Sequence, residues 1–416
     1  MDRDRRDNPV TPAPDVTAPD DSAHQHGGRL LAILCLASIL GVVNFAAPSP
    51  FFPRIARDLD TTIPLLGQLT TVLTLLSALL GIGVGPLADR YGPRRLIVGG
   101  TIAVAINLIG VGLATSYPML LVLAVVAGVG DAVLFGLPLA VAATAFSGAA
   151  QRRAIGWTAA ALPVGVTAGV PLLTLAGGLV GWRSAIAGAG VATLAVAALA
   201  GAWLPPDRSG QGERFGARML LDAYRPLLHH RPIGVLYAAG GLRAACWIGM
   251  LTYLGAFMTA RFDFGARGIG LTYMISGGAV FLGSLVGARR LAGWRPRPLV
   301  ALTTIIQALL LGASFTLPLA AAWTIGLLAI GSFAGAVGGV GLTMLLTRET
   351  PGGMATTMVL NGSVLNLGTA LGAAAGGFLI ANGGYPALGV GLPLFALIAA
   401  LLVWGVSPAA SRDSAD

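Results

Sequence analysis

The sequence predicts an all-α membrane protein with twelve transmembrane helices arranged as two pseudo-repeats of six. The first observation is composition: 55% of the 416 residues are hydrophobic, only 10% are charged, and the mean hydropathy is +0.80. Soluble domains carry about 25% charged residues, so a soluble fold this apolar could not cover its surface, whereas a bilayer accommodates apolar surface. The second and third observations are the spacing of apolar windows and a charged loop that occurs in both halves.

Apolar windows divide the chain at regular intervals. About twenty apolar residues let a helix cross a bilayer, and about twelve windows meet that condition. They cover roughly 30–49, 64–87, 96–115, 118–147, 155–179, 184–204, 233–259, 267–290, 299–318, 322–346, 354–381 and 385–406. The 60 glycines fit this pattern, because small residues allow transmembrane helices to approach closely.

Polar segments separate these windows into two groups of six. Residues 1–28 are polar and predict a disordered cytoplasmic tail. The predicted N-terminal six-helix bundle covers 29–204, the cytoplasmic central loop 205–232, and the C-terminal six-helix bundle 233–406. Residues 407–416 are then a second cytoplasmic tail.

The positive charge predicts the orientation in the membrane. All 26 basic residues are arginines, in short clusters between the windows. With the N-terminus inside, cytoplasmic segments hold about four arginines for each one outside, which is the positive-inside pattern. The outer segments would hold only Arg54, Arg57, Arg183, Arg261 and Arg267. We therefore expect both termini in the cytoplasm and no binding of nucleic acid. The lack of Lys, with much Ala and Gly, favours a bacterial inner membrane.

The stretch "GPLADRYGPRR" at 85–95 concentrates charge between two apolar windows. Gly85 and Gly92 permit close backbone approach and a tight turn. Three arginines of the loop can reach lipid phosphates: Arg90, Arg94 and Arg95. The second half has a counterpart at the corresponding place, "GARRLAGWRPR" at 287–297, which indicates a parallel repeat.

The first of these loops resembles the signature between the second and third helices of the major facilitator superfamily. The matching residues are Gly85, Leu87, Ala88, Asp89, Arg90, Gly92, Arg94 and Arg95. Together with the windows and the central loop, the resemblance covers 30–406. It implies a transporter in which spans one, four, seven and ten line a central cavity.

Two further stretches resemble the twelve-span drug:proton antiporter branch, near the arabinose-efflux and chloramphenicol-efflux permeases. "GVTAGVPLLTLAGG" is similar to the antiporter motif at Gly165, Gly169 and Pro171, with Val170 as an additional residue. "NGSVLNLGTALGAAAGG" resembles a stretch of span eleven in the efflux permeases. The family often has an Arg in span four, where this sequence has Ala124. Antiport would therefore need another group to carry the proton.

Asp89 suggests a conformational latch. A carboxylate is stabilised at a helix N-terminus, and span eleven begins on the same face after "RETPGG". We expect Asp89 to dock there across the two halves, with Arg152 or Arg153 as a second partner. The resemblance implies that such a latch holds the outward-open state. The alternative is a loop that determines topology alone.

Two ionisable side chains fall well inside predicted spans, Asp131 in span four and Arg243 in span seven. Burying either is costly unless it is paired or hydrated. One hypothesis is that Asp131 takes up the coupling proton, because burial disfavours its charged form while a nearby Arg243 favours it. The alternative is a structural ion pair that joins the halves.

Uncharged side chains near the midplane are candidates for the substrate cavity. They are Asn44, Phe135, Trp247, Asn361 and Asn366. Gln307 is a further polar side chain near the midplane. The amides can equally join helices, and the aromatic rings can equally pack in the core or face lipid. The pattern predicts no metal site and no cofactor.

The sequence therefore predicts a secondary active transporter, with proton-coupled efflux of a small apolar or amphiphilic drug or metabolite by alternating access. An uncoupled or sugar-efflux permease of the same fold is the alternative. The expected partners are a small-molecule substrate, protons and the lipid bilayer, and we expect a monomer. No Walker-type loop and no catalytic constellation occurs, so neither an ATP-driven pump nor an enzyme is indicated.

Overall fold

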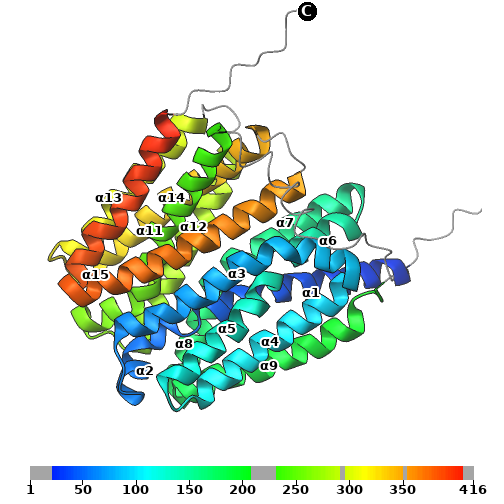
Figure 1. Cartoon of the computed structure of the whole chain (residues 1–416), viewed down its shortest axis with the longest axis horizontal. Helices are drawn as coiled ribbons and strands as arrows, with labels where there is room; N and C mark the ends of the chain where they lie inside the picture. Colours follow the sequence, from blue (N-terminus) through cyan, green and yellow to red (C-terminus); the bar gives the residue numbers. More distant parts are fainter. Residues whose placement is uncertain (1–20, 208–230, 291–295, 350–353, 406–416) are drawn as a thin grey trace, which may run out of the picture.

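The computed structural model describes residues 21–207, 231–290, 296–349 and 354–405, and the regular elements within these ranges are all helices. The N-terminal half contains α1 (Asp21–Ala46), η1 (Ser49–Phe51), α2 (Phe52–Asp58), α3 (Ile63–Tyr91), α4 (Pro93–Leu113), α5 (Tyr117–Leu134), α6 (Leu137–Ala145), α7 (Gly148–Val164), η2 (Gly165–Gly169), α8 (Val170–Val180) and α9 (Trp182–Trp203). The C-terminal half contains α11 (Arg231–Phe262), α12 (Ala266–Arg290), α13 (Pro296–Thr316), α14 (Ala321–Glu349) and α15 (Met354–Gly405). Figure 1 colours the first half blue to green and the second green to red.

The described residues contain 11 helical stretches long and apolar enough to cross a membrane. The longest helix, α15, has 52 residues and is broken at Gly384, where φ is 67°. This left-handed φ suits glycine, and Figure 1 shows the orange and red arms of α15 running in different directions. The break falls between the predicted windows 354–381 and 385–406, so α15 supplies two spans. The predicted fold class is confirmed.

Each half buries its own apolar core and turns other apolar side chains outward. Leu34 and Ile97 are fully buried in the first half, and in the second the ring of Phe257 stacks on that of Phe315 with centroids 4.3 Å apart. Large side chains such as Leu172 remain exposed around the bundle. In water such exposure would be unfavourable, whereas lipid is the solvent that this surface requires.

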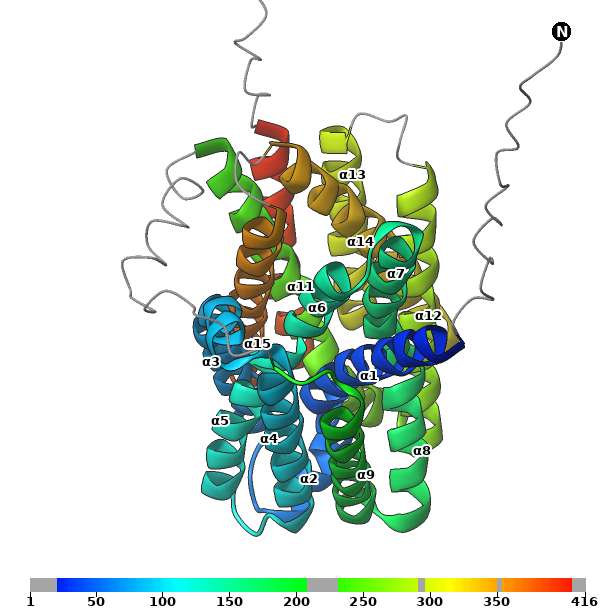
Figure 2. The ribbon, with the colours of Figure 1, turned by 90° about the vertical axis from the view of Figure 1, so that its right-hand side faces the viewer.

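Buried polar groups close one end of the interface between the halves. The hydroxyls of Ser49 and Tyr273 lie 2.6 Å apart. Tyr253 donates to the carbonyl of Ala373 at 2.6 Å, and its ring occupies the space that a Cβ at position 67, a glycine, would fill. Figure 2 shows α12 beside α7 and α8 across the same interface.

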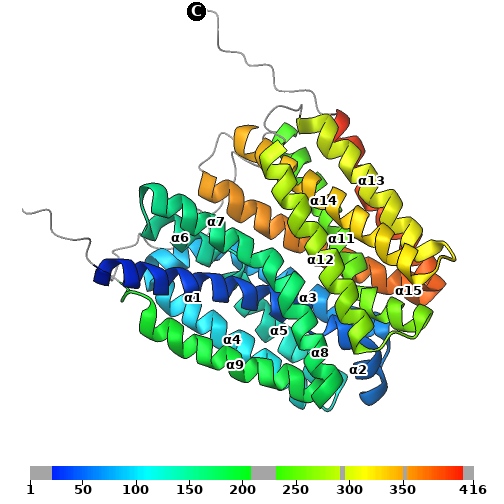
Figure 3. The same ribbon diagram turned by 180° about the vertical axis from the view of Figure 1, so that it is seen from behind.

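The halves diverge at the opposite end. Figures 1 and 3 show them moving apart toward the end of the molecule where α1 begins and α15 ends. The arrangement is therefore closed at one end and open at the other.

Candidate functional site

A cavity of about 610 Å³ lies between the two halves. Its walls come from α1, α3 and α5 on one side and from α11 to α15 on the other. Spans one, four, seven and ten, which are α1, α5 with α6, α11 and α14, all contribute, as the resemblance implies. The lining extends along α14 to Met344, near the end of that helix at Glu349, so the cavity continues toward the open end.

Three aromatic rings contribute to the apolar wall. Phe45 and Phe135 line the cavity from the N-terminal half, and Trp247 lines it from α11. The indole Nε1 of Trp247 donates to the Ser332 hydroxyl at 3.4 Å, which fixes one edge of the ring. An apolar wall with few polar groups is typical of sites for small organic ligands.

Asp131 lies in this cavity and is 2% exposed. Its Oδ2 accepts a hydrogen bond from the Ser77 hydroxyl at 2.8 Å. The amide Nδ2 of Asn366, on α15, donates to the same hydroxyl oxygen at 3.0 Å. The second carboxyl oxygen, Oδ1, is buried without a partner. Asp131 is thus connected through α3 to the opposite half, and its own hydrogen bonding is incomplete.

Arg243 lines the cavity from α11 and is 6% exposed. Its guanidinium donates to the Thr304 hydroxyl and, at 2.7 Å, to the carbonyl oxygen of Gly335. A Cβ at position 338, a glycine, would lie 2.9 Å from Nη1, so the guanidinium rests directly on the α14 backbone. All of these partners are uncharged and belong to the C-terminal half.

Asp131 and Arg243 form no ion pair with each other. Within the described residues, the ion pairs are Arg95 with Asp207 at 3.8 Å and Arg297 with Glu349 at 2.7 Å. The two intramembrane charges therefore share one cavity, but each is bonded to neutral groups.

The structure brings four of the five predicted cavity residues together. Phe135, Trp247, Asn361 and Asn366 line the cavity. The remaining residue, Asn44, is buried outside the lining: it accepts from the Asn107 amide at 2.8 Å and donates to the Ala127 carbonyl at 3.4 Å. Its amide is used to join α1 to α4 and α5.

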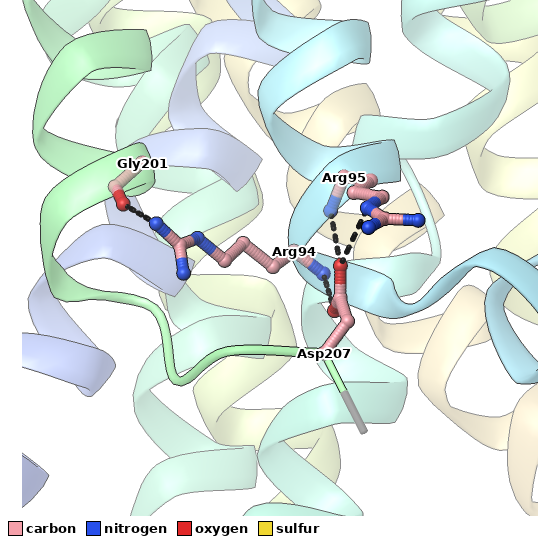
Figure 4. A network of polar contacts seen from close by, with 4 residues as sticks. All are labelled: Arg94, Arg95, Gly201 and Asp207. Carbon is pink, nitrogen blue, oxygen red and sulfur yellow. Dashed lines mark hydrogen bonds and ion pairs between the residues drawn. The ribbon is translucent and has the colours of Figure 1, made fainter. Parts of the chain in front are cut away.

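The charged segment 85–95 comprises the end of α3, a turn at Gly92 and the start of α4. Gly92 has φ 91°, and α4 begins at Pro93. The carboxylate of Asp207 accepts from the backbone N–H of Arg94 at 2.9 Å and of Arg95 at 3.2 Å, as Figure 4 shows. A Cβ at position 92 would overlap this carboxyl group. Gly92 is thus needed both for the turn and for Asp207, which caps α4 at the end where the helix dipole attracts negative charge.

The other residues of the predicted latch form no ion pair with one another among the described residues. Asp89 is exposed, and within the described residues it takes part in neither ion pair. Arg152 and Arg153 are also exposed. The segment 350–353, just before α15, lies outside the described residues. The Asp89 latch stays a prediction.

Comparison with known proteins now identifies the family. A family model described as Major Facilitator Superfamily matches residues 34–359. The chain belongs to the Major Facilitator Superfamily. It is therefore a multi-pass membrane transporter.

Individual relatives are similar to this chain at low identity and over part of its length. The chain is 28% identical over 251 residues to a chloramphenicol resistance protein of Streptomyces lividans, covering 60% of this chain and 63% of that protein. It is 34% identical over 122 residues to the probable nitrate/nitrite transporter NarK2 of Mycobacterium tuberculosis, covering 28% of each. Both matches span less than two thirds of the relative's length.

Solved structures of the superfamily share the fold. One is a bacterial homolog of the human lysosomal transporter Spinster in an inward-facing, unoccupied conformation, with a TM-score of 0.73, 18% identity and coverage of 91% of this chain and 96% of that one. Another is the human organic anion transporter MFSD10, with a TM-score of 0.66, 18% identity and coverage of 91% and 99%. At these identities the likeness concerns the fold alone.

The antiporter-like motif of this facilitator lies at a defect in span five. Gly165–Gly169 form a single π-helical turn, in which the N–H of Val170 bonds the carbonyl of Gly165. A Cβ at Gly169 would lie 2.7 Å from a methyl carbon of Val43, so the motif glycines allow α1 to pack closely. Pro171 stands in the first turn of α8.

Sequence reasoning missed two polar residues, Ser77 and Asp207, which bond the residues described above. Gln307, which the sequence offers as a further polar side chain near the midplane, lines the cavity with its Oε1 buried and unpartnered. Asp207 had a signal, because it is the first acid after span six. Ser77 had none, because hydroxyls are common in these spans. Within the described residues, no three His, Cys, Asp or Glu side chains gather to hold a metal ion.

Proposed function

We propose that this transporter exports a small apolar or amphiphilic molecule, a drug or metabolite, by alternating access. In the same proposal, export occurs in exchange for protons carried by Asp131. In this proposal it acts as a monomer in a bacterial cell membrane with both termini in the cytoplasm. The open end of the molecule then faces the cytoplasm, where the substrate enters.

The observation that carries the proposal is the position of Asp131 in the cavity. A buried carboxylate is unfavourable unless it is paired or fully hydrogen-bonded, and Asp131 leaves Oδ1 without a partner. Such a group is suited to hold a proton in one state and release it when water or a partner reaches it. Its bond to Ser77, which in turn accepts from Asn366, makes its surroundings depend on how the halves meet.

Export is supported by two kinds of observation. The arginine distribution favours cytoplasmic termini, which makes the open end the inner one. Two relatives, from Streptomyces lividans and Pseudomonas aeruginosa, are named chloramphenicol resistance proteins. Resistance by a transporter is most simply export, so chloramphenicol is the first substrate to test.

Inverted membrane vesicles test the proposal directly. Chloramphenicol uptake into vesicles that hold the wild-type protein should follow an imposed pH gradient, acid inside. Collapse of the gradient should abolish accumulation above the outside concentration. Uptake that equilibrates without exceeding the outside concentration, with or without the gradient, would instead establish the uncoupled permease.

A further inference from the structure

We propose that Arg243 sets the charge selectivity of the cavity, so that the site takes uncharged amphiphiles bearing a strong hydrogen-bond acceptor and rejects organic cations. The inference rests on the proposed function only in taking the cavity as the substrate site. It does not depend on proton coupling.

The first step is that Arg243 is held in place. Thr304 on α13 and the carbonyl of Gly335 on α14 accept its hydrogen bonds, and Gly338 lets the guanidinium lie against the α14 backbone. A guanidinium carries five N–H groups, and the two bonds to protein leave donors for a ligand in the cavity that it lines.

The second step is that the charge of Arg243 is not neutralised by an adjacent acid. Its partners are uncharged, and the ion pairs of the described chain lie elsewhere. Asp131 is the acid among the lining residues, and it comes from the other half and bonds Ser77. The lining groups therefore sum to zero charge when Asp131 is ionised and to one positive charge when it is protonated, but never to a negative charge.

The third step is the consequence for a ligand. An organic cation would lose its hydration and meet the fixed positive charge of Arg243 where screening is weak. The one acid that could attract it, Asp131, is already offset by that same charge. A neutral molecule loses little hydration, and its acceptor oxygen gains a charge-assisted hydrogen bond from the guanidinium. Trp247, one helical turn from Arg243, and Phe135 across the cavity provide apolar surface for the rest of the ligand.

A matched pair of probes tests this selectivity on the purified wild-type protein in detergent. Triphenylphosphine oxide is neutral and has a strong acceptor oxygen, whereas methyltriphenylphosphonium has the same three aryl groups and a permanent positive charge. Binding is measured by isothermal titration calorimetry. Wild type should bind the oxide at least about tenfold more tightly than the phosphonium, since a charge-assisted bond and a like-charge contact act in the same direction.

Arg243→Gln should reverse the preference, because Asp131 is then the remaining charge of the cavity. The affinity for the oxide should fall about tenfold, and the affinity for the phosphonium should rise about tenfold. A gain of saturable phosphonium binding by a variant that melts like wild type separates this effect from misfolding. Arg243→Lys keeps the charge and should still reject the phosphonium. Arg54→Gln is the matched control, because Arg54 bonds the carbonyl of Gly177 away from this cavity, and it should bind as wild type does.

Three results would overturn the inference. They are equal binding of both probes by wild type, binding of neither, and an Arg243→Gln variant that melts normally without gaining phosphonium affinity. Because binding needs no gradient, failure of coupled uptake in vesicles would leave these results unchanged, so the two proposals can fail separately.

Discussion

The two charged side chains of the cavity are held in opposite ways. Arg243 makes its hydrogen bonds within its own half, to Thr304 and Gly335. Asp131 makes one bond to Ser77, which also accepts from Asn366 of the other half, and leaves one oxygen unpartnered. A group whose partners all lie in one rigid body keeps its surroundings when the halves rock, whereas a group whose partner is bonded across the halves does not. The comparison assigns constant charge to Arg243 and a changing environment to Asp131.

Loss of the titrating group should have the largest effect. Asp131→Asn keeps the size and the bond to Ser77 but cannot ionise, so uphill uptake should fall to background while downhill exchange of substrate persists. Both fluxes are measured in proteoliposomes with and without a pH gradient.

The same variant separates coupling from a structural ion pair. Removing one partner of a buried pair typically costs about 3–5 kcal/mol, which the double variant with Arg243→Gln would restore. Because the two side chains form no pair here, we expect a normal melting temperature and no rescue. Lost stability that returns in the double variant, together with coupled flux, would exclude Asp131 as the proton site.

The latch provides the next prediction. Asp89→Asn preserves shape and removes a charge that the folded state described here does not use, because Asp89 is exposed. Transport should fall severely while membrane insertion and melting temperature stay unchanged. Arg94→Ala should transport better than Asp89→Asn, because it removes the bond from the Arg94 guanidinium to the Gly201 carbonyl but leaves the Asp89 carboxylate in place. Wild-type rates in purified Asp89→Asn protein would show that the loop determines topology alone.

The bond between the halves should have a smaller effect. Ser77→Ala removes the donor to Asp131 and the acceptor for Asn366, so the pH profile of uptake should shift and stability should fall by about 1 kcal/mol. Thr74→Val is the matched control: Thr74 also lines the cavity, but its hydroxyl bonds the Thr70 carbonyl of its own helix. An unchanged pH profile in Ser77→Ala would disconnect the chain of bonds from coupling.

The capping carboxylate should have the smallest effect on transport. Asp207→Asn weakens an N-cap, which typically contributes about 0.5–2 kcal/mol, so the melting temperature should fall while coupling remains intact. Gly92→Ala should destabilise more, because it adds a Cβ at φ 91° and overlaps Asp207. If neither variant melts earlier than wild type, Asp207 does not stabilise the loop.

The fold could be predicted because a bilayer imposes simple requirements. Span length, arginine distribution and the break near Gly384 are all local properties of the chain. Asp131 and Arg243 could be assigned to the cavity because ionisable side chains inside a membrane rarely face lipid. That the two side chains bond neutral groups instead of each other could not be read from the sequence. It depends on where other helices supply Ser77, Thr304 and Gly335.

The hydroxyl groups show why the rest of the site could not be predicted from the sequence. Thr74 and Thr101 donate to the carbonyl four residues earlier in their own helices, which needs no tertiary partner. Ser77 bonds across helices instead, and nothing in its sequence neighbourhood distinguishes it. The position of Asn44 outside the cavity lining could not be read from the sequence either, because its partner Asn107 lies on a neighbouring helix.

The π-helical turn of span five can accommodate the additional residue that the resemblance to the antiporter motif implies. One inserted residue rotates everything after it by about 100° around a regular α-helix. A single π turn absorbs that rotation, and Gly165–Gly169 is such a turn, immediately before Val170. Consequently α8 keeps the face that packs on α12, although the chain is one residue longer than the motif. A deletion of Val170 should therefore restore an unbroken helix, while most substitutions that keep chain length should leave the wide turn in place.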